Sequence, residues 1–138
     1  MKKVLVDLNV LLDFLAKREN HERAAMVINL CETKVLRGYV AAHEITTLAY
    51  FLSSTYKSHK SPNSIINGIL DIFSTISVNE KILRSALDSN IKDYEDAVIE
   101  QCALKESVDY IITGNISDFK KGNVNSITPS EYLALLNN

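Results

Sequence analysis

Short apolar runs alternate with longer stretches of helical periodicity along the whole of this chain. The run VLVDL at residues 4–8 suits a strand buried on both faces, whereas HERAAMVINLCETK at residues 21–34 spaces its apolar residues as one face of a helix. Strands that alternate with helices predict an α/β fold, in which helices cover both faces of a parallel sheet. The expected strands lie at residues 4–8, 39–42, 75–78, 109–114 and 125–128. The expected helices lie at residues 9–18, with Asn9 as the cap, and at 21–34, 44–56, from about 62, 79–89, 94–107 and 129–136.

The composition is typical of a compact globular protein. Of the 138 residues, 46% are hydrophobic and 23% are charged, and no repeat or linker interrupts them, so we expect one domain over residues 1–138. Cys31 and Cys102 fall within helical apolar patterns and lack metal-ligand spacing, which is typical of reduced core thiols in a cytoplasmic protein. The net charge of −2 excludes a generally basic nucleic-acid binder, so such a partner would need local basic clusters or bound cations.

The first residues, MKKVLVDLNVLLDFLA, carry the two lysines and the apolar run of a signal peptide. Asp7, Asn9 and Asp13 interrupt that run and no small-residue cleavage site follows, so we predict no signal peptide. No segment reaches the roughly 18 uncharged apolar residues of a membrane span. We therefore expect a cytoplasmic protein that does not contact a membrane.

The stretch KDYEDAVIEQ at residues 92–101 places acidic side chains directly before a helical apolar run. Asp93 and Asp96 are three residues apart, so on a helix their like charges lie on neighbouring turns, roughly 5–6 Å apart at Cβ. Capping and the helix dipole account well for Asp93. They account less well for Asp96, which borders the stripe of Ile99 and Ala103 and there needs a cation, a donor or a metal. On this stretch alone both interpretations stay open.

Three further acids are expected at the same edge of the sheet as Asp96. Asp7 lies at the carboxyl end of the first strand, Glu44 opens the helix after the second, and Asp118 follows the strand at 109–114. Each could be structural, as a helix cap, a partner of the helix dipole or an Asx-turn. Open α/β sheets bind ligands at this edge, and four acids there would repel one another unless a cation binds among them. Mg²⁺ and Mn²⁺ prefer oxygen ligands, so the placement favours a divalent metal site.

Two pairs of lysines are candidates for contacts with phosphate. Lys57 and Lys60 lie in the turn-rich stretch KSHKSPNS, and Lys120 and Lys121 follow Asp118. Charge pairs on loops are usually solvated surface, and that alternative stays open beside phosphate binding.

Other catalytic chemistries have little support. The chain contains no GxSxG, Walker or GxGxxG motif, which excludes the hydrolase, nucleotide-triphosphatase and dinucleotide sites that those motifs mark. His21, His43 and His59 form no HExxH motif, so we expect them to be solvated or capping.

Five segments together carry a resemblance to a known family: VLVDLNVLLD, EITTLAYFL, DYEDAVIEQCAL, DYIITGNISDF and TPSEYL. In this order they resemble the PIN-domain family, and within it the VapC-like toxin ribonucleases and their stand-alone relatives. The resemblance implies a three-layer α/β/α fold with a central, mostly parallel five-stranded sheet. It also implies four acids that bind Mg²⁺ or Mn²⁺, and cleavage of single-stranded RNA to 5′-phosphate and 3′-hydroxyl ends.

The resemblance assigns the four acids one by one. Asp7 matches the aspartate of the first strand, Glu44 the glutamate of the third helix, Asp96 the aspartate of the D-A motif and Asp118 that of the DF motif. These four are therefore expected to be the catalytic and metal-binding residues. Four polar neighbours look like supporting groups behind them: Asn9, Asp93, Thr113 and Asn115.

Two positions depart from the family pattern. Leu8 stands where relatives usually carry a small hydroxyl residue, which weakens the positioning of Asp7. Gly114 stands where toxins often carry Arg, which removes a phosphate contact. All four acids are present, so we do not interpret the chain as degenerate.

The function that follows is a divalent-metal-dependent endoribonuclease. Its partners would be single-stranded or structured RNA and, for the toxin of a toxin–antitoxin pair, a small antitoxin, with a homodimer as a family expectation. One alternative is a metal-dependent phosphatase or phosphotransferase with Asp7 as nucleophile, but Asn9 stands where such enzymes want a second aspartate. The other alternative is a non-catalytic PIN-like binding protein, against which the four acids argue.

Overall fold

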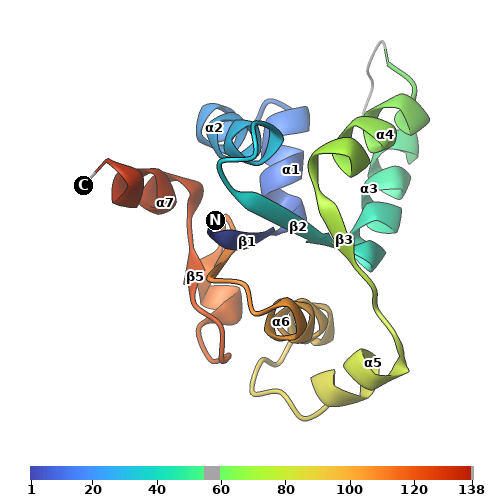
Figure 1. Ribbon diagram of the computed structural model, residues 1–138. Helices are drawn as coiled ribbons and strands as arrows, with labels where there is room; N and C mark the ends of the chain where they lie inside the picture. Colours follow the sequence, from blue (N-terminus) through green and yellow to red (C-terminus); the bar gives the residue numbers. More distant parts are fainter. Residues whose placement is uncertain (55–59, 138) are drawn as a thin grey trace.

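The computed structural model describes residues 1–54 and 60–137, and it contains a five-stranded sheet between layers of helices (Figure 1). The strand order is β3-β2-β1-β4-β5, and every neighbouring pair is parallel. This confirms the predicted fold class. The strands are β1 Lys3–Val6, β2 Arg37–Ala41, β3 Ser74–Ile76, β4 Tyr110–Ile112 and β5 Ser126–Ile127. The helices are α1 Leu8–Leu15, α2 His21–Glu32, α3 Ala42–Ser54, α4 Pro62–Ile72, α5 Glu80–Ala86, α6 Tyr94–Glu106, the 3₁₀ helix η1 Ile116–Phe119, and α7 Pro129–Leu136.

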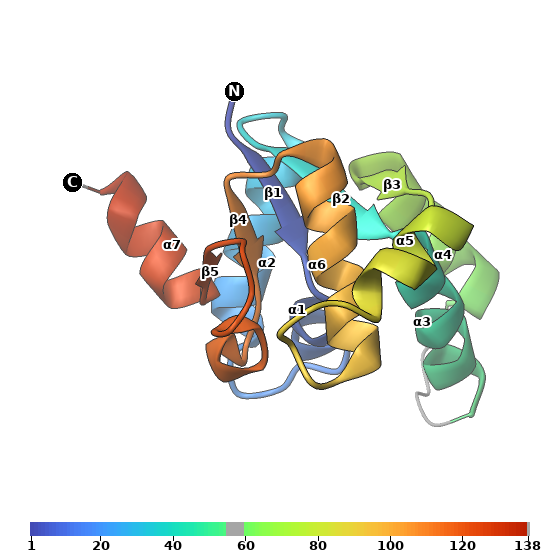
Figure 2. The same cartoon turned by 90° about the horizontal axis from the view of Figure 1, so that it is seen from below.

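The two faces of the sheet are buried by different helices. Side chains alternate along a strand, so Val4 and Val6 of β1 face the layer of α1 to α4, and Leu5 faces α5 and α6. Figure 2 looks from the side of α5 and α6 and shows α6 lying across the middle of the sheet. At the edge beside β5, α7 joins the first layer, where Tyr132 packs edge-on against Tyr110. Burial on both faces explains why the central strands β1 and β4 are almost continuously apolar.

The start of α1 differs from its expected position. β1 ends at Val6, and Asp7, rather than Asn9, is the N-cap of α1. The backbone explains this, because the Asp7 N–H still donates to the Ile112 carbonyl of β4 at 2.9 Å, whereas its side chain already accepts from Leu8 N. Asp7 is therefore held at the carboxyl edge by both the sheet and the helix.

The other helices lie where they were predicted, with boundaries that differ by at most three residues, and the predicted end of the helix at 44–56 lies outside the described residues. Asp93 caps α6, as the sequence indicated, and Pro62 and Pro129 stand in the first turns of α4 and α7. Cys31 and Cys102 are buried free thiols, as predicted, and burial raises their pKa to about 12 and about 11. Among the described residues, no helix combines the length and apolar character needed to cross a lipid bilayer.

Candidate active site

The structure brings the four predicted acids to one edge of the sheet. Asp7 follows β1, Glu44 lies in the first turn of α3 directly after β2, and Asp118 lies in η1 just beyond β4. Asp96 stands in the first turn of α6 and approaches from the layer below the sheet. The negative charges of Asp7 and Asp118 both raise the pKa of Asp96, so all three lie within electrostatic reach of one another.

Asp7 and Glu44 form a buried pair of carboxyl groups. They are 6% and 2% exposed, and the Leu8 N–H donates to both, at 2.9 Å to Asp7 Oδ1 and 3.2 Å to Glu44 Oε1. Burial, followed by the charge of Asp7, raises the pKa of Glu44 to about 9, and burial also raises the pKa of Asp7. In the absence of a metal, Glu44 therefore keeps its proton at neutral pH and donates it in a hydrogen bond to Asp7.

The second oxygen of Asp7 is fixed by a chain of polar side chains. Thr113 Oγ1, at the end of β4, donates to Asp7 Oδ2 at 2.9 Å and accepts from Asn9 Nδ2 at 3.2 Å. Asn9 Oδ1 in turn accepts from Gly114 N at 3.0 Å. These bonds tie the ends of β1 and β4 together and fix the direction in which the Asp7 carboxylate points.

Asp118 is held by a separate set of contacts. Asn115 Nδ2 donates to Asp118 Oδ1 at 3.0 Å, and Ser117 Oγ donates to Asn115 Oδ1 at 2.6 Å. The neighbouring Phe119 is 1% exposed and anchors η1 in the core beneath α6. The side chain of Asp118 remains partly exposed beside these anchors.

Asp93 and Asp96 differ in the role that the structure gives them: Asp93 caps a helix, and Asp96 does not. Asp93 Oδ2 accepts from Asp96 N at 3.1 Å and caps α6, as an ordinary helix cap does. The Asp96 carboxyl makes no such bond to a described residue. Its pKa is raised to about 7, first by burial and then by the charges of Asp93, Asp118, Asp7 and Glu95.

The chemistry of this donor set fits a hard divalent cation. All four groups are carboxyls, and no lysine or arginine within residues 1–54 and 60–137 forms an ion pair with any of them. Burial is the largest cause of the raised pKa values of Glu44 and Asp96, and the negative charges of neighbouring acids, which no described cation compensates, raise both further. In the described part of the chain no three His, Cys, Asp or Glu residues stand in an arrangement that could hold a metal ion as placed.

Of the two pairs of lysines that are candidates for contacts with phosphate, one lies beside the acids in the described part of the chain. Lys57 lies outside the described residues, and Lys60 is exposed just before the N-cap of α4. Lys120 and Lys121 line a cavity of about 350 Å³ that Asp93, Asp96 and Asp118 also line. Lys92 lines the same cavity and was missed, although it opens the acidic stretch, because a lone lysine before a helix cap carries no pattern.

His43 was predicted to be solvated or capping, and this was wrong. Both ring nitrogens are shielded from solvent and have no hydrogen-bond partner among the described residues. Burial lowers the pKa of His43, against the opposing charges of Glu95 and Asp7. No sequence pattern indicates that the His43 ring is buried. The family motif at this point of the chain concerns its neighbour Glu44.

The two departures from the family pattern lie beside Asp7 and Asn9. Leu8 is buried, and its contribution to the site is the backbone N–H that both carboxyl groups accept from. A Cβ added at Gly114 would lie 3.5 Å from Asn9 Oδ1, an ordinary contact, so the fold does not require glycine there.

Several solved structures share the fold of this chain. A chain of VapBC2 from Rickettsia felis, bound to a DNA fragment from its promoter, has a TM-score of 0.69 at 17% identity and covers 91% of this chain and 98% of that one. FitAcB from Neisseria gonorrhoeae gives 0.69 at 18% identity, covering 92% and 98%. A toxin–antitoxin complex from Klebsiella pneumoniae gives 0.67 at 17%, covering 91% and 97%. At these identities the likeness establishes a shared fold.

The sequence itself matches the family described as the PIN domain over residues 3–117, a range that contains Asp7, Glu44 and Asp96 and ends one residue before Asp118. Comparison with curated proteins gives no significant match. The family match covers most of the chain and confirms the resemblance that the motifs indicated. The chain therefore belongs to the PIN-domain family.

Proposed function

We propose that this protein is a divalent-metal-dependent endoribonuclease that hydrolyses phosphodiester bonds of single-stranded RNA with Mg²⁺ or Mn²⁺. The observation that carries the proposal is the buried pair of Asp7 and Glu44, which shares the carboxyl edge of the sheet with Asp96 and Asp118. A stable fold gains nothing from four neighbouring acids, two of them with pKa values of about 7 and about 9. Membership of the PIN-domain family supports a nuclease as the class of enzyme.

The contacts of the chain's own residues support the following roles. Asp7, Glu44, Asp96 and Asp118 would hold the metal, and Glu44 would give up its proton when the metal binds. Thr113 keeps one oxygen of Asp7 in place, and so leaves the other directed by the Leu8 N–H. A bound Mg²⁺ or Mn²⁺ would lower the pKa of a water molecule and neutralise charge that develops on the phosphate.

The negative charge of the site also affects the binding of RNA. Without a cation, the negative charges of the cluster repel a phosphate backbone. Binding of the substrate at this edge is therefore expected to depend on the divalent metal as strongly as cleavage does.

The experiment that tests this proposal compares two neighbouring aspartates. Asp93→Asn keeps a good helix cap, because Asn caps about as well as Asp, so activity should change only modestly. Asp96→Asn is nearly the same size but removes a charged oxygen ligand, so Mn²⁺-dependent cleavage of single-stranded RNA should fall by a factor on the order of 100 or more. Folding is checked by circular dichroism, and EDTA should abolish cleavage by the wild type. Equal losses in both variants, or cleavage that survives EDTA, would refute the assignment.

We further propose a small antitoxin as the protein partner, which makes this chain the toxin of a toxin–antitoxin pair and a homodimer within the complex. The support is that one of the structures with this fold is a toxin–antitoxin complex from Klebsiella pneumoniae. The test is co-expression with the product of any short reading frame next to the gene. A stable complex whose mass contains two copies of this chain, and which suppresses RNA cleavage, is the expected result. An adjacent product that neither binds nor inhibits contradicts the proposal.

A further inference from the structure

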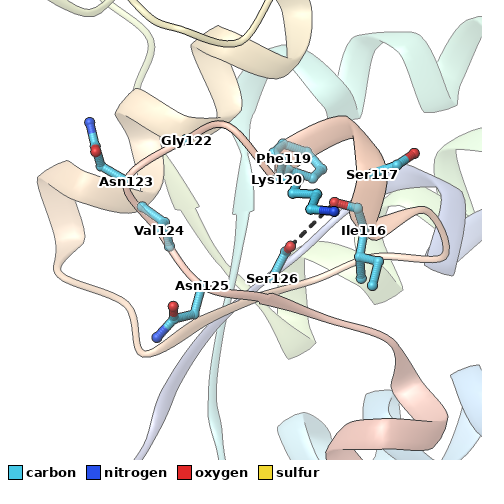
Figure 3. Close-up of a pocket in the computed structure, with 9 residues that line it drawn as sticks. All are labelled: Ile116, Ser117, Phe119, Lys120, Gly122, Asn123, Val124, Asn125 and Ser126. Carbon is cyan, nitrogen blue, oxygen red and sulfur yellow. Dashed lines mark hydrogen bonds between the residues drawn. The ribbon is translucent and has the colours of Figure 1, made fainter.

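Two cavities adjoin each other beside the candidate active site. The first, of about 350 Å³, is lined by Asp96 and Asp118 together with lysines. The second, of about 580 Å³, lies between η1 and the segment that leads into β5 (Figure 3). Ser117 and Lys120 line both, so the two cavities are neighbours, and we refer to them together as the depression. Both volumes fall within the range of small-ligand pockets in proteins, roughly 300–1,000 Å³.

The first cavity combines the acids with lysines that form no ion pair within the described part of the chain. Lys92, Lys120 and Lys121 are exposed, and none of them forms an ion pair with a described residue. Lysines this close to Asp96 and Asp118 would ordinarily be expected to pair with them. Without an ion-pair partner among the described residues, they can offer positive charge to phosphate groups that bind beside the acids.

The walls of the depression are fixed by one buried side chain. Glu100 of α6 is 1% exposed and accepts from Ser89 Oγ at 2.6 Å and from Asn123 N at 2.7 Å. Ser89 Oγ in turn accepts from Ile91 N at 3.0 Å, so Glu100 fastens both the segment before α6 and the segment after η1. These two segments carry Lys92 and Lys120. The cavity is thus formed before any ligand arrives, which lowers the entropy lost on binding.

The second cavity has the mixed lining that a nucleoside requires. Figure 3 shows the side chain of Lys120 extending toward Ile116 and Ser126, and the amides of Asn123 and Asn125 projecting from the rim. Ile116 is 41% exposed and offers an apolar surface to the flat face of a base. Amide groups can bond to base edges, and single-stranded RNA is recognised mainly through unstacked bases of this kind.

We propose that this depression is a nucleotide subsite, in which Lys120 binds a phosphate next to the scissile one and the pocket between η1 and β5 holds the adjoining nucleoside. The inference rests on the proposed ribonuclease function and adds to it the path of the strand. Most of the pocket is built by residues beyond 117, where the match to the family ends.

The test measures binding and cleavage separately, with two matched pairs of variants. Binding of a fluorescent eight-nucleotide single-stranded RNA is measured by anisotropy with Mn²⁺, in an Asp118→Asn background that prevents cleavage. Lys120→Gln should raise the Kd about tenfold and flatten the dependence of log Kd on log salt by about 0.7, which is one phosphate contact of a single strand. Lys105→Gln is the control, because Lys105 lines a different cavity that has no acidic residue, and it should leave both quantities unchanged.

The second pair tests the nucleoside pocket with a matched change of charge. Asn125→Asp places a negative charge on the rim and should weaken binding several-fold, whereas Asn29→Asp makes the same change on the exposed surface of α2 and should not. Either pocket variant behaving like its control overturns the subsite, even if the wild type cleaves RNA. Binding that depends on Lys120 and Asn125 in a protein that does not cleave RNA with Mn²⁺ upholds the subsite and refutes the nuclease.

Discussion

The proton on Glu44 makes the stability of the metal-free protein depend on pH in an unusual direction. Unfolding returns the Glu44 pKa from about 9 to its ordinary value of 4.5, so the native state binds more protons between these limits. Stability must therefore fall as the pH rises through this window, the opposite of a salt-bridged carboxylate. Asp96, whose pKa is raised from 3.8 to about 7, adds to the fall only up to about pH 7.

We therefore predict that stability falls with rising pH in two separate pH ranges, one governed by Asp96 and one by Glu44. In EDTA, urea midpoints of the wild type should decrease steadily from pH 5 to pH 9. Glu44→Gln keeps an amide that donates to Asp7, and it should remove the decrease between pH 7 and pH 9, whereas Asp96→Asn should act mainly below pH 7. A wild-type profile that is flat or rises between pH 7 and pH 9 would contradict the assignment of the proton to Glu44.

A second prediction concerns the repulsion that Asp118 exerts. Its charge raises the pKa of both Asp7 and Asp96, and an Asn at this position still offers an oxygen to Asn115. In EDTA, Asp118→Asn should therefore leave the free energy of unfolding unchanged or raise it. The control is Asp71→Asn on the exposed surface of α4, which should have no effect. A clear loss of stability in Asp118→Asn alone would identify Asp118 as a structural residue.

At the scale of single elements, α6 buries more of its side chains than its sequence pattern predicts. Helical periodicity predicts one buried stripe, yet Ala97, Val98, Ile99 and Glu100 are all buried in succession. The cause is tertiary, because α6 lies across the sheet and also contacts α5 and η1. A glutamate within EDAVIEQ resembles any exposed helical residue, so Glu100 could not have been predicted from the sequence.

The close approach of the 120–125 segment to α6 leads to a third prediction. A Cβ at Gly122 would lie 2.5 Å from Glu100 Oε2 and 2.8 Å from Ile91 Cδ1, and the Glu100 carboxylate cannot move without losing its hydrogen bonds. Gly122→Ala should cost about 1–3 kcal/mol of stability. Gly68→Ala is the control, because nothing lies within 4 Å there and the change should stabilise α4 by about 0.5–1 kcal/mol. Urea denaturation in EDTA measures both, and equal effects would refute the close contact.

The elements that the sequence predicted well are those with a local cause. Strands buried on both faces are apolar throughout, and prolines and capping residues mark the starts of α4, α6 and α7. Because parallel strands end at one edge, the placement of Asp7, Glu44 and Asp118 followed from the strand pattern alone. What could not be predicted depends on packing between segments far apart in the chain, as with Glu100, His43 and the cavity lined by Lys92.

At the scale of the whole molecule, a metal that binds only the native state must stabilise all of it. At a Mn²⁺ concentration 100 times its Kd, the gain is about 2.7 kcal/mol, or roughly 10 °C in Tm for a chain of this size. The shift should be smaller at pH 6 than at pH 8, because Glu44 and Asp96 must lose protons before they bind the ion. Scanning calorimetry with Mn²⁺ and with EDTA checks this, and Asp96→Asn should reduce the shift. An unchanged Tm in millimolar Mn²⁺ would contradict the metal site.

The strand order has a consequence for the protein while it is being made. The central strand β1 leaves the ribosome first, but the partner on one of its sides, β4, pairs Tyr110 with Val4 and is made only after more than 100 further residues. Until then Asp7 lies at the end of an unfinished sheet, without Thr113 to orient it or Asp118 to complete the cluster. The ribonuclease that we propose would thus remain inert beside the messenger that encodes it for most of its own synthesis.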